Sequence, residues 1–327
     1  MCPTTTQCTT SCQTVAGNSN NTAGSSISAL NLPQKIYIDS LSNLYVSDST
    51  NQRVIKFSYG STTNGQIILG TTGVPGSNLS LLDYPTGLQL DSNGNLLVVD
   101  ANNHRVIKLF TNGTVTVVAG ISGQSSSSLN HLRNPNDLYI TADNTLYVSD
   151  QNNNRVLRFA PNSTGGDNGI IVASGLNDPR AVYVDTNLNL YVADTNSHVI
   201  RQFTRTNATY NVLVAGNTTA GSSTSLLNLP RAVTLDETTT PDTMYIADTG
   251  NNRILTWVIG ATSGTVFAGT SSPGPCTSLN NPFDVKLDLT KSKVYIADYN
   301  NNRVMRSNGM YYFLLYNMNS LRINRVD

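Results

Sequence analysis

The sequence predicts an all-β protein, a six-bladed β-propeller of four-stranded antiparallel blades that an N-terminal strand closes. Three observations predict this fold: a turn-rich composition, a segment that recurs six times, and a start of the chain that copies an internal repeat. The 327 residues include 41 Asn, 33 Ser and 39 Thr but a single Glu, Glu237. Asn and Ser favour turns, whereas helices are usually rich in Glu, Leu and Lys. The composition therefore excludes a helical bundle.

Charge and hydropathy exclude two classes of partner. The formal net charge is zero and 12% of the residues are charged, against a usual figure of about 25%. A nucleic-acid-binding protein normally carries a basic surface, so we expect no nucleic-acid partner. No apolar run approaches the roughly 18 residues that cross a bilayer, so we expect no membrane span. The sequence still has 39% hydrophobic residues, enough for a sizeable core.

One segment recurs six times, and its period gives the size of the repeating unit. Each copy has an apolar stretch, an Asp, a loop rich in Asn and a second apolar stretch. The copies are LYVSDSTNQRVIKF at 44, LLVVDANNHRVIKLF at 96, LYVSDQNNNRVLRF at 146, LYVADTNSHVIRQF at 190, MYIADTGNNRILTW at 244 and VYIADYNNNRVMR at 294. Their aspartates are 52, 50, 44, 54 and 50 residues apart, which is long enough for several strands per unit.

Each unit contains four strand signals. A short alternating strand begins at a proline, as at Pro33, and a turn such as residues 91–95, with its Asn-Gly, follows. The second strand, for example residues 44–46, is apolar at every position, as expected where neighbouring sheets cover both faces. The Asp-Arg loop, a third strand and a fourth strand such as residues 117–120 complete the unit. Four antiparallel strands repeated six times describe a propeller.

The recurrent segment, above all the Asp-x-Asn-Asn-His-Arg-Val of the second unit, resembles the NHL repeat family of six-bladed propellers. The resemblance covers about residues 13–306, which leaves a Cys- and Thr-rich leader at 1–12 and a divergent tail at 307–327. It implies one of three settings: a substrate receptor of a ubiquitin ligase, an RNA-binding protein, or an extracellular or sensor module.

Residues 14–33 closely copy residues 213–230, where a fourth strand leads into the next unit. We therefore expect residues 14–17 to complete the sixth blade and to remove an exposed sheet edge. Residues 311–316 compete for the same position, so the tail is an alternative outer strand.

Asp and Arg five residues apart recur in five units, which favours a structural role over a catalytic one. We expect the Asp to bind backbone N–H groups of the loop and the Arg to bridge to the Asp or to a neighbouring blade. In the fourth unit the loop is expected to be one residue shorter, with His198 at the arginine position or just before a deleted arginine. The pairs are Asp48/Arg53, Asp100/Arg105, Asp150/Arg155, Asp248/Arg253 and Asp298/Arg303.

The units differ most just after the proline that begins each first strand, where first strands should line the central channel. Two arginines on adjacent blades beside an aromatic residue would suit an anionic or peptide ligand. The alternative is that these residues are only solvated strand ends. The predicted binding rim comprises Gln34, Lys35, Thr86, Asn136, Asp137, Arg180, Arg231, Phe283 and Asp284.

No catalytic or metal site is predicted. The histidines, His104, His131 and His198, belong to different blades, too far apart for zinc ligands that all lie about 2 Å from the metal. Relatives include a zinc lyase and calcium-dependent lactonases, for which Asn136, Asp137 and Asp284 are the nearest equivalents of channel ligands. We therefore expect a non-enzymatic, monomeric module that binds a protein or peptide and needs no cofactor. The alternatives are the substrate-recognition part of a ubiquitin ligase and a metal-dependent lyase or lactonase.

Four cysteines, Cys2, Cys8, Cys12 and Cys276, bear on the compartment. Cys12 begins the closing strand and is expected on the face opposite the loop that carries Cys276. A four-residue strand spans about 13 Å, more than a disulfide bridges, so the two are not expected to bond. Cys2 or Cys8 would then reach Cys276, and a pairing within the leader is equally open. No signal peptide is visible, so the chain is either cytoplasmic or begins after a cleaved signal. An extracellular location is slightly favoured.

Overall fold

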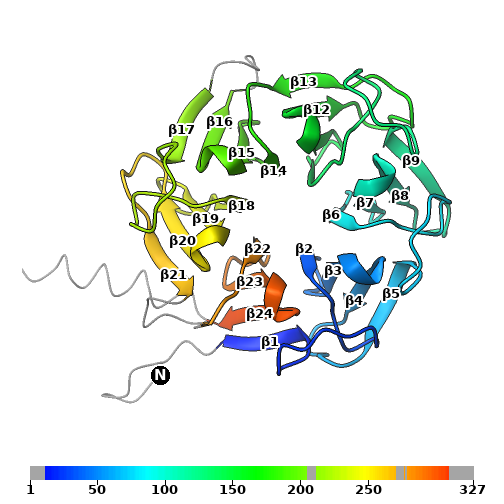
Figure 1. Ribbon diagram of the computed structural model, residues 1–327, viewed down its shortest axis with the longest axis horizontal. Helices are drawn as coiled ribbons and strands as arrows, with labels where there is room; N and C mark the ends of the chain where they lie inside the picture. Colours follow the sequence, from blue (N-terminus) through cyan, green and yellow to red (C-terminus); the bar gives the residue numbers. More distant parts are fainter. Residues whose placement is uncertain (1–11, 205–210, 270–275, 277, 309–327) are drawn as a thin grey trace, which may run out of the picture.

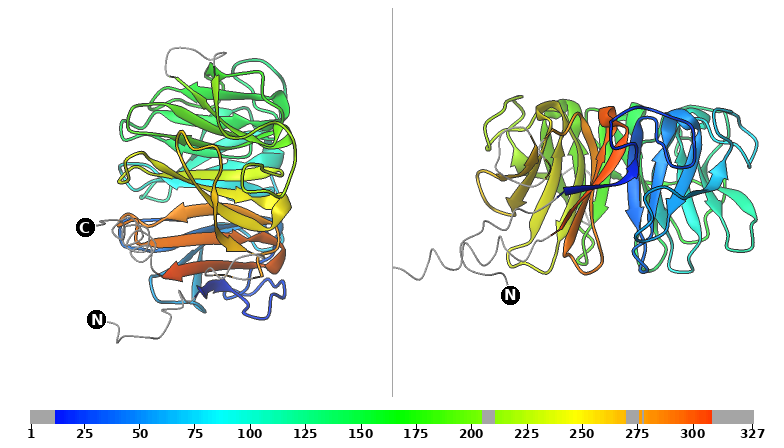
Figure 2. Two further views of the ribbon diagram at one scale, coloured as in Figure 1. Left: turned by 90° about the vertical axis from the view of Figure 1, so that its left-hand side faces the viewer. Right: turned by 90° about the horizontal axis from the view of Figure 1, so that it is seen from below.

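The computed structural model describes residues 12–204, 211–269, 276 and 278–308. Within these ranges six four-stranded antiparallel sheets surround a central channel (Figures 1 and 2). The predicted all-β, six-bladed propeller is confirmed. No helix in the described part of the chain is long and apolar enough to cross a membrane.

Blades 1 to 3 follow one another along the chain, each from its innermost to its outermost strand. Blade 1 contains β2 (Pro33–Ile38), β3 (Leu44–Asp48), β4 (Arg53–Phe57) and β5 (Gly65–Gly70). Blade 2 contains β6 (Pro85–Leu90), β7 (Leu96–Asp100), β8 (Arg105–Leu109) and β9 (Val115–Gly120). Blade 3 contains β10 (Leu138–Ile140), β11 (Leu146–Asp150), β12 (Arg155–Phe159) and β13 (Ile170–Ala173).

Blades 4 and 5 repeat this order, and blade 6 takes its outermost strand from the start of the chain. Blade 4 contains β14 (Pro179–Val184), β15 (Leu190–Asp194), β16 (Val199–Phe203) and β17 (Asn211–Gly216). Blade 5 contains β18 (Pro230–Asp236), β19 (Thr243–Asp248), β20 (Arg253–Val258) and β21 (Thr265–Gly269). Blade 6 contains β22 (Pro282–Leu287), β23 (Lys293–Asp298), β24 (Arg303–Asn308) and β1 (Cys12–Gly17).

A short 3₁₀ turn joins the second and third strands of every blade, and the face that carries these six turns is called the η face. Figure 1 looks onto this face. Each turn ends at a residue in the left-handed backbone region, such as Gln52 (φ 59°). The turns are η1 (Ser49–Asn51), η2 (Ala101–Asn103), η3 (Gln151–Asn153), η4 (Thr195–Ser197), η5 (Thr249–Asn251) and η6 (Tyr299–Asn301).

The core lies between the blades, where the second strands are covered on both faces. The central residue of each second strand is fully buried, with 0% exposure, because adjacent sheets pack against it. Burying such an aliphatic side chain contributes about 1.5–3 kcal/mol. These residues are Val46, Val98, Val148, Val192, Ile246 and Ile296.

The N-terminal strand closes the ring as the sequence predicts. β1 pairs antiparallel with β24, with Cys12 opposite Ser307 and Gly17 opposite Arg303. The paired strand begins at Cys12, two residues before the predicted start. The competing segment, residues 311–316, lies outside the described residues. Because β1 comes from the start of the chain and β24 from its last repeat, their pairing holds blade 6 together across the whole sequence.

The disulfide differs from the prediction, because Cys12 itself bonds to Cys276 with a Cα–Cα distance of 5.0 Å. The expectation that Cys12 is too distant assumed that outer strands run parallel to the channel. Sheet twist instead accumulates from strand to strand, so β1 lies across the line of sight in Figure 1 and begins beside β21 of blade 5. Cys276 lies at the same corner, where its carbonyl accepts a hydrogen bond from the Gly269 N–H. The predicted pairings of Cys2 and Cys8 lie outside the described residues.

Candidate functional site

The repeated Asp-Arg pairs tie the η-face turns to the loops between blades. In blade 1 the Asp48 carboxylate accepts hydrogen bonds from Arg53 Nε (2.8 Å), Asn51 Nδ2 (2.8 Å) and the Asn31 backbone N–H (2.7 Å). Arg53 also donates to the carbonyls of Ser25 and Ser26 at 2.9 and 2.7 Å. The carboxylate in each of the five pairs is 0% exposed. These contacts join the turn of blade 1 to the loop that precedes the blade.

Blade 4 departs from this pattern in a different way from the one expected. Its loop has the same length as the others, since Asp194, η4 and His198 occupy the positions of Asp48, η1 and Gln52. Val199 stands at the arginine position and pairs with Asp194 in the sheet. Arg201, two residues further on, supplies the missing charge, with Nε 2.6 Å from Asp194 Oδ2. The prediction of a shorter loop was therefore wrong. An arginine two residues further along the strand and a deleted loop residue both leave the usual position without an arginine, so the spacing alone does not distinguish them.

His104 and His198 have structural roles in a ring of bonds between blades. His104 Nδ1 accepts a hydrogen bond from the Asn134 N–H (3.2 Å), and His198 Nδ1 accepts one from the Leu229 N–H (3.1 Å). The other four blades use Gln52, Asn154, Asn252 and Asn302 in the same way. His131 instead contacts its neighbour Asn130. No group of three or more His, Cys, Asp or Glu that would suit a metal ion occurs among the described residues.

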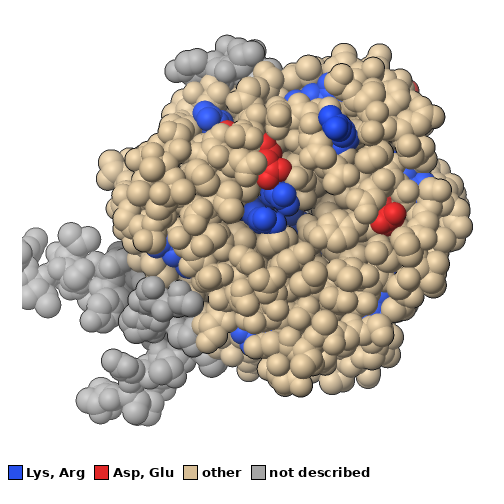
Figure 3. Space-filling view, viewed as in Figure 1, with Lys and Arg blue, Asp and Glu red and all other residues tan. Residues whose placement is uncertain are grey.

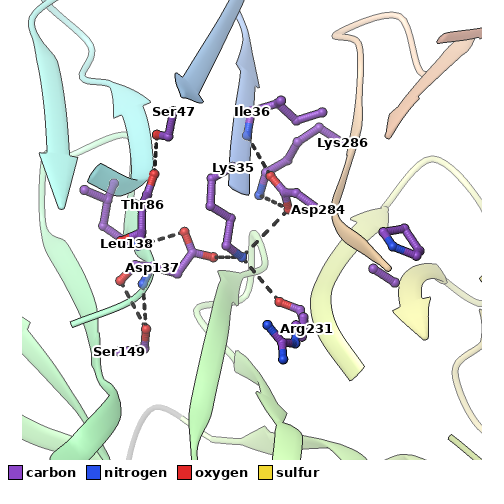
Figure 4. A network of polar contacts seen from close by, with 12 residues as sticks. Lys35, Ile36, Ser47, Thr86, Asp137, Leu138, Ser149, Arg231, Asp284 and Lys286 are labelled. Carbon is purple, nitrogen blue, oxygen red and sulfur yellow. Dashed lines mark hydrogen bonds and ion pairs between the residues drawn. The ribbon is translucent and has the colours of Figure 1, made fainter. Parts of the chain in front are cut away.

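Three residues of the predicted rim, Lys35, Asp137 and Asp284, meet inside the channel (Figure 4). Together with Lys286 they form an ion cluster, here called the Lys35 cluster. Lys35 Nζ lies 3.0 Å from Asp137 Oδ2 and 3.9 Å from Asp284 Oδ1. Lys286 Nζ lies 3.8 Å from the same Asp284 oxygen. Lys35 Nζ also donates to the Arg231 carbonyl at 3.3 Å. The cluster therefore joins blades 1, 3, 5 and 6 across the channel.

Burial dominates the electrostatics of the Lys35 cluster. It raises the pKa of Asp284, an effect that the charges of Lys286 and Lys35 oppose. Asp284 Oδ2 accepts a hydrogen bond from the Ile36 N–H (3.0 Å), while Oδ1 has ion-pair neighbours but no hydrogen-bond donor among the described atoms. Opposite charges at these distances compensate for much of the cost of burying each ion.

Close contact between inner strands positions Asp137. The Gly87 N–H donates to the Asn136 carbonyl at 2.9 Å, and a Cβ atom on Gly87 would lie 2.7 Å from Asp137 Cα. Ser149 Oγ accepts a hydrogen bond from the Asp137 N–H at 2.8 Å. The Asn136 N–H also donates to the Ser149 carbonyl, and the Ser149 N–H to the Asp137 carbonyl, both at 3.0 Å, and the regular strand β10 begins at Leu138.

The other rim residues, Arg180, Arg231 and Phe283, lie on the η face beside Tyr84 and Tyr299. These five residues form a half-exposed site, here called the mouth cluster. The Arg231 guanidinium carbon lies 4.1 Å from the centre of the Phe283 ring. Phe283 stacks on Tyr299 with ring centres 3.7 Å apart and planes 7° from parallel. The Tyr84 and Tyr299 hydroxyl groups are 3.3 Å apart. Blades 5 and 6 thus contribute one continuous stack, and the Tyr84 hydroxyl, just before blade 2, contacts its end.

The two arginines of the mouth cluster are partnered differently. Arg180 Nε lies 2.9 Å from Asp178 Oδ2, whereas Arg231 has no carboxylate within ion-pair distance in the described ranges, and its buried Nε has no hydrogen-bond partner there. Burial, and then the charge of Arg180, lowers the pKa of Arg231 to about 10, so it remains a cation at neutral pH. Figure 3 shows Lys and Arg side chains gathered at the centre of this face beside acidic ones.

The structure thus divides the predicted rim into two parts. Arg180, Arg231 and Phe283 come together at the mouth. The other six residues are 0–6% exposed, unlike the solvated strand ends of the alternative interpretation: Gln34 3%, Lys35 3%, Thr86 1%, Asn136 6%, Asp137 3% and Asp284 0%. The Thr86 carbonyl accepts a hydrogen bond from Ser47 Oγ, but Thr86 Oγ1 has no partner among the described atoms.

Sequence reasoning missed Tyr84 and Tyr299 as members of the site. Tyr299 directly follows the repeated Asp298, at a position that holds Ser49, Ala101, Gln151, Thr195 and Thr249 in the other blades. A lone aromatic residue at that position was the available signal. Burial and the hydrogen bond to Tyr84 raise the pKa of the Tyr299 hydroxyl, so it is neutral and available as a hydrogen-bond donor at physiological pH.

Comparison with known proteins supports the repeat and the fold. The NHL repeat model matches residues 82–109, 132–159 and 176–203. No protein with a curated description matches the chain. Among solved structures, a streptogramin B lyase shares 14% identity over 84% of this chain and 78% of its own, with a TM-score of 0.57.

Two further solved structures have the same architecture. A gluconolactonase from Xanthomonas campestris shares 14% identity, covering 86% of each chain, with a TM-score of 0.63. An auxiliary nutrient binding protein from Bacteroides thetaiotaomicron shares 15% identity over 90% of this chain and 75% of its own, with a TM-score of 0.66. At such low identity these similarities establish the fold alone. The chain thus contains three matched NHL repeats within a closed six-bladed propeller.

Proposed function

We propose that this propeller is a non-enzymatic binding module whose mouth cluster binds a carboxylate group of a protein or peptide ligand. The observation that carries the proposal is Arg231, a cation without a carboxylate partner among the described residues, held against Phe283 at the channel mouth. Guanidinium groups bind carboxylates in a bidentate geometry, and Arg and aromatic residues are enriched among the residues that dominate binding energy.

The surroundings of Arg231 favour a ligand that is both anionic and partly apolar. The stack of Phe283 and Tyr299 offers a flat aromatic surface, and the Tyr84–Tyr299 hydroxyl pair offers polar contacts beside it. Arg180 adds a second cation, already shared with Asp178. A peptide C-terminus or an acidic side chain next to an apolar one has this combination of chemistry.

The Lys35 cluster supports a binding role over a metal-dependent lactonase role. Asp137 and Asp284 are the channel carboxylates that would serve such an enzyme, and the Lys35 ammonium lies between them at 3.0 and 3.9 Å. A cation of the chain itself therefore stands where a metal ion would compete for the same oxygens. Lyases and lactonases share the fold, so the argument for binding comes from the site alone.

A peptide selection tests the proposal. A phage library of random twelve-residue peptides is selected against the wild-type protein, and the affinities of enriched peptides are measured by fluorescence anisotropy. We expect acidic peptides whose affinity falls at least tenfold in the Arg180→Ala/Arg231→Ala variant. The control is Arg133→Ala, which removes an exposed arginine from a loop between blades and should leave affinity unchanged. If the double variant binds every selected peptide as tightly as wild type, the mouth cluster is not the binding site.

We also propose an extracellular location, for which the Cys12–Cys276 disulfide is the support. Disulfides persist in oxidising compartments and are rare in the cytosol. Peptide mass spectrometry of unreduced protein from its native source would detect the cross-linked peptide. Free thiols at both positions would contradict this location.

A further inference from the structure

A deep groove separates blades 1 and 2 on the outer side of the ring, and its volume is about 790 Å³. The equivalent space between blades 2 and 3 holds about 30 Å³. Apolar side chains, among them Tyr45, Leu69 and Phe110, line the larger groove together with polar ones such as Gln66 and Thr111. This space, called the β5 groove, is distinct from the mouth cluster, with which it shares no residue.

The difference between the two spaces follows from one connection in each blade. In blade 3 the third and fourth strands are joined by residues 160–169, and this loop folds back onto blade 2. Ser163 Oγ donates to the Val118 carbonyl (2.9 Å), and the Gly165 N–H donates to the Val117 carbonyl (2.9 Å). In blade 2 the same connection is only residues 110–114, too short to cover blade 1.

The β5 groove therefore runs along an uncovered sheet edge. β5 is the outermost strand of blade 1 (Figure 1). Between Gln66 and Leu69 the described backbone hydrogen bonds are those to β4, with none from a covering loop. Ile67 is 38% exposed. Such an edge is a template for an added strand.

The charge in the groove indicates what the added strand would carry. Lys56 and Lys108 occupy the same position in β4 and β8, the third strands of blades 1 and 2. Lys108 Nζ lies 2.7 Å from Asp91 Oδ2. Lys56 instead lies over the Tyr45 ring, 5.1 Å from its centre, and has no described carboxylate within ion-pair distance. It is the one charged residue of the groove lining, so an acidic group would complement it.

We infer that the β5 groove binds an extended segment of a partner protein, which adds to β5 as a fifth strand, buries alternate apolar side chains and places an Asp or Glu beside Lys56. Residues 160–166, although they form a loop and not a strand, already bond to the corresponding edge of blade 2 through Ser163, Gly165 and Gly166. β5 has six residues, so we expect a recognised segment of about that length.

The test uses a graft of the natural loop as an intramolecular competitor. In the graft variant, the sequence of residues 160–169 replaces residues 110–114. A phage library of random twelve-residue peptides is selected against wild type and depleted against the graft variant. We expect peptides with apolar residues at alternate positions and an acidic residue, and slower hydrogen exchange at residues 66–69 when they bind.

Point variants make the test independent of whether the graft folds. Lys56→Glu should weaken the selected peptides at least tenfold, while Arg158→Glu, the equivalent position of blade 3, should not. The Arg180→Ala/Arg231→Ala variant should bind them normally, which separates this inference from the mouth cluster. Equal affinity for Lys56→Glu and wild type would overturn the inference. Dimerisation of the protein that Lys56→Glu or the graft abolishes would also overturn it, since the occupant would then be a second copy.

Discussion

The loops of the η face and the mouth of the channel lie side by side, yet the hydrogen bonding of their buried polar groups differs. In blade 1, the Asp48 carboxylate and the Arg53 guanidinium each bind several partners, and four other blades repeat the pair. At the mouth, Arg231 Nε has no partner among the described atoms, although it too is buried.

This difference distinguishes the Asp-Arg pairs, which hold the loops in place, from the residues of the proposed binding site. A buried polar group without a partner costs about 1–3 kcal/mol, so an unpartnered arginine is retained against its own stability cost, whereas a fully bonded one stabilises the fold. The repeated Asp-Arg pairs are fully bonded, whereas Arg231, which lies outside the repeat pattern, keeps an unpartnered Nε among the described atoms.

The largest expected effect comes from breaking a repeated pair. Arg155→Ala should lower the free energy of unfolding by about 3–5 kcal/mol, because it leaves the Asp150 carboxylate buried without its cation and removes bonds to the Ser127 and Ser128 carbonyls. Arg201→Ala, in blade 4, also leaves a buried carboxylate, that of Asp194, without its cation, but the other described contact of Arg201 is Asn211 alone, so we expect a loss at the lower end of this range, about 3 kcal/mol. Chemical denaturation measures both. Equal losses would contradict the view that loop bonding, beyond charge pairing, makes the scaffold.

Ring closure is the second-largest contribution to test. Cys12→Ser/Cys276→Ser should lower the free energy of unfolding by about 2–4 kcal/mol, because the Cys12–Cys276 bond closes a long loop of chain. The expected first consequence is loss of β1 from blade 6, seen as faster hydrogen exchange at residues 12–17. Unchanged exchange there would show that pairing with β24 suffices to hold the strand.

A smaller effect, dependent on pH, is expected at the face opposite the η turns. Burial raises the pKa of Asp91, but hydrogen bonds from Asn95 and Lys108 outweigh burial and hold this pKa below its ordinary value. The ionised carboxylate therefore stabilises the fold above the unfolded pKa of about 3.9, and this contribution is lost as the pH falls through the folded pKa.

Asp91→Asn should therefore cost about 1 kcal/mol at pH 7, and the difference from wild type should shrink as the pH falls below about 4. Thermal unfolding at a series of pH values measures it. A difference that stays constant from pH 7 to pH 3 would show that the charge of Asp91 is not the cause.

The smallest effect on stability is expected at the mouth. Arg231→Ala removes a contact with Phe283 worth about 0.5–1 kcal/mol and also removes an unpartnered buried donor. The free energy of unfolding should therefore change by less than about 1 kcal/mol. A loss comparable to that of Arg155→Ala would place Arg231 in the scaffold and remove the distinction between the two regions.

The sequence by itself determined the blade count, the position of the strands within the repeat and the recurring spacing of the Asp-Arg pairs, and it predicted a closing strand at residues 14–17 with residues 311–316 as the alternative. These features depend on local chemistry, namely turns, alternation of apolar residues and pairs five residues apart, and six copies made each of them readable. The fourth repeat shows the limit, because the shift of its arginine from residue 199 to Arg201 could not be told from a deletion without the strand register.

Only the tertiary structure decided which rim residues meet. Lys35 and Asp137 are 102 residues apart, and their ion pair depends on the positions of blades 1 and 3 around a closed ring. The approach of Cys12 to Cys276 depends on the twist accumulated across a sheet, and the stack of Arg231, Phe283 and Tyr299 depends on the packing of blades 5 and 6. The position of a blade in the ring and the twist of a sheet depend on many residues together, so no short segment of the sequence determines either of them.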